Sequence, residues 1–90
     1  MNLDELRLEI NDVDSKLVPL LLQRMELAHQ VGVYKKAHGI PILNSAREQE
    51  ILEKVCDPAP PEQKAYIKKL YEKIMEVSRE YQADIMGEDQ

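Results

Sequence analysis

Apolar residues recur along the first part of the chain with alternating spacings of three and four residues. They stand at Leu3, Leu6, Ile10, Val13, Leu17, Leu20, Leu27, Val31 and Tyr34. This spacing is typical of a helix whose apolar face packs against another helix. Arg24 interrupts the series between Leu20 and Leu27, and Gly39 and Pro41 are stop signals beyond its end. The pattern predicts one long helix over residues 3–37.

Pro19 lies inside this predicted helix. Proline has no backbone N–H, so it removes the hydrogen bond to the carbonyl of Ser15, at a cost of about 3 kcal/mol. The apolar series keeps the same phase before and after Pro19, and we therefore expect a kink. The alternative is that Pro19 divides the segment into two short antiparallel helices of a monomeric bundle.

Two further helices follow. Ser45 and Glu48 have the spacing of a capping box, which predicts a helix over residues 45–56. Pro60 or Pro61 suits the first turn of a third helix, over residues 60–86. Its apolar stripe consists of Ile67, Leu70, Tyr71, Ile74, Tyr81 and Ile85.

The composition favours a single all-α domain over residues 1–90. The four aromatic residues are all tyrosine, and Phe and Trp are absent, so large residues that strongly favour strands are few. A helix of 35 residues extends about 50 Å, whereas a compact chain of this length has a diameter of roughly 30 Å. The first helix is too long for its own globule, and we expect a second copy of the chain to cover it in a two-fold homodimer.

The net charge and the cysteine content indicate which partners and which cellular compartment to expect. The formal net charge of −5 argues against nucleic acid or an anionic membrane as the main partner. No apolar run approaches the roughly 20 residues of a membrane span, and no secretory signal is evident. Cys56 is the sole cysteine, which favours a reducing cytoplasm. His29 and His38 are expected at the surface, and no pair of residues has convincing metal-ligand spacing.

Several polar residues stand in positions that suit a small anion. Arg24 and Lys35 are eleven residues apart, which places them about 20° apart around a helix and about 16 Å apart along it. Long side chains there could hold a small molecule between them. Arg7 lies about 25 Å from Arg24 along the axis and about 100° around it, so it cannot reach the same ligand within one chain.

Other donors extend this set. Arg47 lies at the start of helix 45–56, where the helix dipole favours anions. Ser78 and Gln82 are four residues apart beside the apolar stripe of the third helix. Each residue also has a structural interpretation: Arg24 could fix the register of a helical seam or pair with Glu26 or Glu50, and the others could be ordinary surface groups.

Two segments of the chain resemble the all-helical (AroQ-type) chorismate mutases. They are "LRLEINDVDSKLVPLLLQRMELAHQVGVYKKAHGIPILNSAREQEIL" and "IMEVSREYQ". The resemblance implies an intertwined homodimer in which residues of both chains form each active site. It also implies the conversion of chorismate to prephenate, a Claisen rearrangement on the route to phenylalanine and tyrosine that needs no cofactor or metal.

The resemblance also implies roles for individual residues. The site residues it indicates are Arg7, Arg24, Lys35, Asn44, Arg47, Glu48, Ser78 and Gln82. The two substrate carboxylates would be held by Arg24, Arg47 and Ser78 of one chain. Arg7 of the other chain would complete this set. Lys35 and Gln82 would donate to the ether oxygen of the breaking bond, and Glu48 would accept from the ring hydroxyl.

The sequence departs from this family at two positions. The family often has an aspartate where this chain has Asn44, and it keeps the helix continuous where this chain has Pro19. Two other functions stay open at this point. One is isochorismate pyruvate lyase, which has a related fold, and the other is a non-catalytic helical dimer that acts as a regulatory module.

Overall fold

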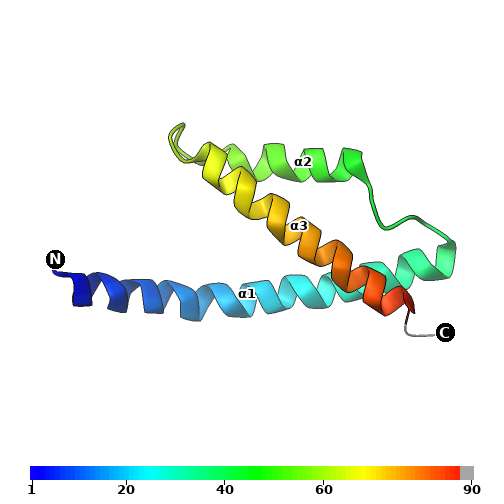
Figure 1. The fold of residues 1–90 in the computed structure, drawn as a ribbon, viewed down its shortest axis with the longest axis horizontal. Helices are drawn as coiled ribbons and strands as arrows, with labels where there is room; N and C mark the ends of the chain where they lie inside the picture. The colour runs from blue at the N-terminus through cyan, green and yellow to red at the C-terminus, as the bar shows by residue number, and fades with distance from the viewer. Residues whose placement is uncertain (88–90) are drawn as a thin grey trace.

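The computed structural model describes residues 1–87, which form three α-helices joined by turns. These are α1 (Leu3–His38), α2 (Ser45–Cys56) and α3 (Lys64–Gly87). Helix α3 runs diagonally between the other two (Figure 1) and packs against both, whereas the backbones of α1 and α2 do not approach each other directly. The predicted all-helical fold is confirmed, and the described part of the chain contains no strand.

Helix α1 is continuous through Pro19, so the alternative of two short helices is wrong. Asn2 caps its first turn, because the side-chain oxygen accepts the Glu5 N–H at 2.8 Å. Gly39 ends the helix in the left-handed region at φ 63°, and the Ile40 N–H reaches back to the carbonyl of Lys35 at 2.9 Å. His38, which was expected in the following loop, lies in the last turn of α1.

Helix α3 begins at Lys64, whereas the sequence prediction placed its start at residue 60. The Pro60–Pro61 pair contributes to this difference, because a residue before proline is disfavoured in the helical region and Pro60 is therefore a poor first helical residue. A turn intervenes instead, in which the Pro60 carbonyl accepts the Gln63 N–H at 2.8 Å. The Lys64 ammonium then donates to the carbonyls of Cys56 and Asp57, at 3.1 and 3.2 Å. These bonds tie the start of α3 to the end of α2.

The core is small and lies where α3 crosses α1. Within residues 1–87, the buried apolar side chains are those of Ala28, Met75 and Ile85, and Ser78 and Gln82 are buried beside them. Leu70, which the sequence placed in the apolar stripe of the third helix, is 60% exposed, so the buried stripe is centred on other residues of α3. No large side chain of the described chain is completely enclosed.

The apolar face of α1 is largely uncovered. The radius of gyration is 16.3 Å, whereas a compact chain of this length has about 12 Å. The long axis of the molecule, 53 Å, runs along α1 (Figure 1). The exposed apolar residues of the predicted seam are Leu3, Leu6, Ile10, Val13, Leu17, Leu20, Leu27, Val31 and Tyr34. Helix α1 is therefore longer than the rest of the chain can cover.

A membrane-spanning function finds no support in these helices. None of them, within residues 1–87, combines the length and the apolar character that crossing a bilayer requires.

Replacement of Gly39 by alanine should lower the free energy of unfolding by about 1–2 kcal/mol, because an L-residue is strained at positive φ. A Cβ atom at this position meets no other atom within 4 Å, so the loss reports backbone strain alone. Chemical denaturation monitored by circular dichroism measures it. Gly87→Ala is the matched control, since that glycine also faces open space but has no positive φ; equal losses in the two variants would contradict this explanation.

Candidate functional site

A cavity of about 260 Å³ lies between the three helices, and all three contribute to its lining. Helix α1 provides Arg24, Leu27, Ala28, Val31 and Lys35; the α1–α2 loop provides Ile42 and Asn44; α2 provides Arg47, Glu48 and Ile51; and α3 provides Met75, Ser78, Arg79 and Gln82. Seven of the eight residues indicated by the sequence thus lie around one cavity.

The eighth residue, Arg7, lies outside this cavity. It is on the exposed N-terminal part of α1, where its guanidinium is 3.9 Å from the carboxylate of Asp4. This position agrees with the helix geometry, which excludes Arg7 from the ligand site of its own chain.

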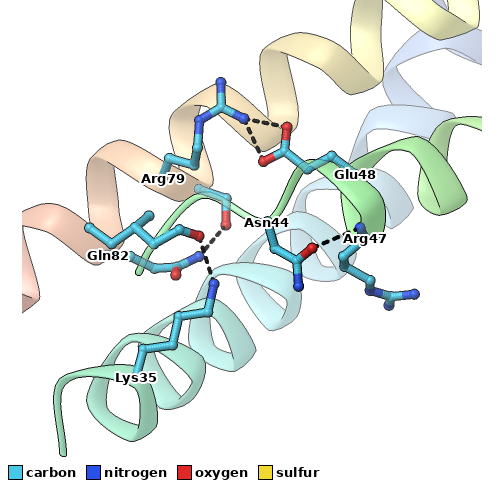
Figure 2. Close-up of polar contacts among 8 residues, drawn as sticks. Lys35, Asn44, Arg47, Glu48, Arg79 and Gln82 are labelled. Atoms are coloured by element: carbon cyan, nitrogen blue, oxygen red, sulfur yellow. Dashed lines mark hydrogen bonds and ion pairs between the residues drawn. The ribbon is translucent and has the colours of Figure 1, made fainter. Parts of the chain in front are cut away.

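The two cations of α1 differ in their contacts. The Lys35 ammonium donates to the carbonyl of Ile42 at 2.7 Å (Figure 2) and so ties the α1–α2 loop to the edge of the cavity. Arg24 is half-buried, and its side chain makes no hydrogen bond or ion pair with any residue among 1–87. The alternative pairing with Glu26 or Glu50 is therefore absent, and the guanidinium remains available to a ligand.

Asn44 is the N-cap of α2. Its backbone is extended, at φ −128° and ψ 92°, and its side-chain oxygen accepts the Arg47 N–H at 3.0 Å (Figure 2). The capping box predicted at Ser45 and Glu48 is wrong, because Asn44 already provides the side-chain acceptor for the first turn. Glu48 is consequently not used as a capping residue.

Glu48 instead pairs with Arg79 across the α2–α3 interface. The Arg79 Nη1 atom lies 2.5 Å from both carboxylate oxygens of Glu48 (Figure 2). Sequence reasoning missed Arg79, although it directly follows Ser78 in "SREYQ". Its partner is 31 residues away in the chain, so only the packing of α2 against α3 reveals the pair.

Arg47 has a second, exposed partner. Its guanidinium lies 2.6 Å from the Glu50 carboxylate, on side chains that are 59% and 67% exposed. In Figure 2 the Arg47 side chain extends away from the Glu48–Arg79 pair. An ion pair this exposed contributes little, about 0–1 kcal/mol, so it does not prevent Arg47 from turning toward a ligand.

Ser78 and Gln82 form the buried polar part of the cavity. The Gln82 amide donates to the Ser78 hydroxyl at 3.2 Å, and the Gln82 carbonyl oxygen is buried without a hydrogen-bond partner in the described chain. Gly32 makes room for this side chain, since a Cβ atom there would lie 3.3 Å from Cγ of Gln82. An unsatisfied buried amide is costly, which indicates a place where a ligand can bind.

A second cavity of about 320 Å³ lies between α1 and α3 and is mainly apolar. Its lining residues are Leu21, Arg24, Met25, Leu70, Lys73, Ile74 and Val77. Arg24 lines both cavities, but the second one lacks the carboxylate and the buried amide of the first. Within residues 1–87, no three His, Cys, Asp or Glu side chains come close enough together to hold a metal ion.

Three helices around a cavity rich in cationic side chains define a helical domain suited to a small anion. A family model for chorismate mutase type II matches residues 6–83. The chain therefore belongs to the chorismate mutase type II family, a family of isomerases, as its sequence predicts.

Individual relatives agree with this membership. The chain is similar to the T-protein of Haemophilus influenzae, with 43% identity over 57% of this chain and 14% of the relative. The chorismate mutase of Methanocaldococcus jannaschii is 36% identical over 59% of this chain and 54% of the relative. The intracellular chorismate mutase of Mycolicibacterium smegmatis is 31% identical over 69% and 60%. The matched segment thus spans less than two thirds of each relative.

Replacement of Asn44 by alanine should lower the free energy of unfolding by about 1 kcal/mol, because the first turn of α2 loses its cap. Asn44→Asp should retain nearly all the stability, since aspartate caps a helix as well as asparagine does. Urea denaturation measures both variants. Asn2→Ala removes the corresponding cap of α1 and is the comparison, with a similar loss expected. An Asn44→Asp variant as unstable as Asn44→Ala would contradict the capping role.

Proposed function

We propose that this chain catalyses the conversion of chorismate to prephenate, in phenylalanine and tyrosine biosynthesis. The observation that carries the proposal is the gathering of Arg24, Lys35, Arg47 and Gln82 around one cavity, with Arg24 unpaired among the described residues. Chorismate carries two carboxylates, a ring hydroxyl and an ether oxygen, and each has a suitable side chain in this arrangement. The rearrangement breaks the ether C–O bond and forms a C–C bond within one molecule, so no group is transferred to or from the protein.

Binding restrains the substrate before it reacts. Arg24, Arg47 and Ser78 hold the two carboxylates, together with Arg7 of a second copy of the chain. Guanidinium groups suit this task because they bind carboxylates through two parallel hydrogen bonds. The enolpyruvyl group is flexible in solution, and fixing it over the ring removes the entropic part of the barrier.

Lys35 and Gln82 stabilise the negative charge that grows on the ether oxygen as the bond breaks. Both are donors held by other contacts: Lys35 is anchored near the Ile42 carbonyl, and Gln82 bonds to Ser78. A half-turn of the Gln82 amide keeps a bond to the Ser78 hydroxyl, which can donate or accept, and presents the NH₂ group to the ligand. Donors fixed in advance cost no reorganisation during the reaction.

Glu48 accepts a hydrogen bond from the ring hydroxyl. Each oxygen of an ionised carboxylate has two lone pairs. The pairing with Arg79 therefore leaves acceptor capacity for a hydroxyl group.

The active form is an intertwined homodimer in which the partner's α1 covers the exposed seam of this α1. The small core, the uncovered apolar residues of α1 and the mainly apolar second cavity support this arrangement. It also brings Arg7 of each chain to the site of the other, which a single chain cannot do. A cytoplasmic location accords with the lone Cys56 and with the relative that is named intracellular.

Purified protein incubated with chorismate should form prephenate well above the uncatalysed rate, and Lys35→Ala should lower kcat by about 10²–10³-fold because one donor to the ether oxygen is lost. Product identification by chromatography separates prephenate from the pyruvate that a lyase would release. Lys54→Ala, at an exposed position of α2, is the charge-matched control and should leave kcat unchanged. An inactive wild-type chain would refute the mutase mechanism. Full activity in a Lys35→Ala variant that keeps its helicity and the mass of the dimer would refute it as well.

Subunit sharing predicts complementation between inactive chains. Heterodimers of Arg7→Ala and Lys35→Ala chains should recover activity, since one of their two sites receives neither substitution. Differently tagged chains, unfolded together, refolded and purified through both tags, provide the sample for the assay. Heterodimers no more active than the two parents would exclude the shared site, and homodimers of each variant refolded in the same way are the control.

A further inference from the structure

An anion-binding cavity that also contains an acid presents an electrostatic conflict. Glu48 lines the same cavity as Arg24, Lys35 and Arg47. A dicarboxylate that enters this cavity is attracted by the cations but repelled by an unpaired carboxylate. The Glu48 side chain is only 24% exposed, so solvent screens this repulsion less than at an open surface. A cation paired with Glu48 would remove this repulsion.

Arg79 has the position and the contacts of that cation. Its Nη1 atom bridges both oxygens of Glu48 at 2.5 Å, and the Arg79 side chain is 33% exposed (Figure 2). The pair joins α3 to α2, which fixes the carboxylate from a helix other than its own. The pair of Arg47 with Glu50 is different, because it lies within one helix and is more than half exposed.

We propose that Arg79 is a positioning residue that acts through Glu48. It neutralises the carboxylate and fixes its direction, so that Glu48 can accept the ring hydroxyl of the substrate without repelling the two substrate carboxylates. The inference rests on the proposed mutase function and deepens it, since it assigns a role to a residue outside the set that the sequence indicated.

The kinetic signature of this role is a change in KM. The two substrate carboxylates carry the same charge before and during the rearrangement, so an unpaired Glu48 repels them equally in the ground state and the transition state. The charge that grows on the ether oxygen is stabilised by Lys35 and Gln82, so the main effect of an unpaired Glu48 is on binding. Loss of such uniform binding raises KM and leaves kcat unchanged. Arg79→Gln should therefore raise KM for chorismate about tenfold and change kcat by less than about twofold.

The effect of Arg79→Gln should depend on the Glu48 carboxylate. In the Glu48→Gln background no carboxylate is left unpaired, so the double variant Arg79→Gln/Glu48→Gln should have a KM within about threefold of that of the single variant Glu48→Gln. Arg79→Lys keeps the cation, so its KM should stay within about threefold of that of wild type. Lys69→Gln removes one positive charge from an exposed position of the same helix and is the control, with an unchanged KM.

The outcomes separate the possible roles of Arg79. If Arg79→Gln raised KM about tenfold in the Glu48→Gln background as well, Arg79 would bind the substrate directly. A fall in kcat accompanied by lost helicity would mean that the pair only joins α2 to α3, and equal KM values for Arg79→Lys and Arg79→Gln would exclude charge neutralisation. Each of these results overturns the proposal but leaves the mutase function intact. An inactive wild-type chain would overturn both.

Discussion

The close approach of α3 to α1 is the contact on which the other features of the site depend. Among the described helices, α2 packs against α3 and not against α1, so its position relative to α1 is set indirectly. At the crossing, Gly32 leaves space for the Gln82 side chain, and Ser78 bonds to the same amide. Polar groups that would normally weaken a core are placed here between Met75 and Ile85. Part of the small core of this chain therefore also lines the binding site.

The charges around the cavity are arranged in two ways. Arg24 has no partner within residues 1–87. The Lys35 ammonium keeps further N–H donors beside its bond to the Ile42 carbonyl, and Arg47 has an exposed carboxylate partner that a ligand can replace. Among the described residues that line the cavity, the Glu48–Arg79 pair joins two helices and engages both carboxylate oxygens. The cavity therefore contains three cations that can bind a ligand and one acid, Glu48, whose charge is neutralised by Arg79. This combination suits a ligand with two carboxylates and a hydroxyl group.

The features that depend on local pattern could be predicted from the sequence. The spacing of apolar residues predicted α1 through Pro19, and the eleven-residue spacing of Arg24 and Lys35 placed both on the face that lines the cavity. The errors arose where several local signals compete. Ser45 and Asn44 are both good caps, and the backbone conformation decided between them; Pro60 is a poor helix start because Pro61 follows it. Arg79 could not be found at all, since its role depends on which residues of α2 face α3.

The position of the site along α1 has a consequence for how this chain can change in length. One inserted residue between Arg24 and Lys35 would turn Lys35 by about 100° around the helix and move it about 1.5 Å along the axis. No side-chain adjustment restores that register, so this stretch should accept substitutions and reject insertions. The connection between Cys56 and Lys64 is different, because none of its residues lines the cavity. Natural variation in length is therefore expected at the α2–α3 turn and not within the second half of α1.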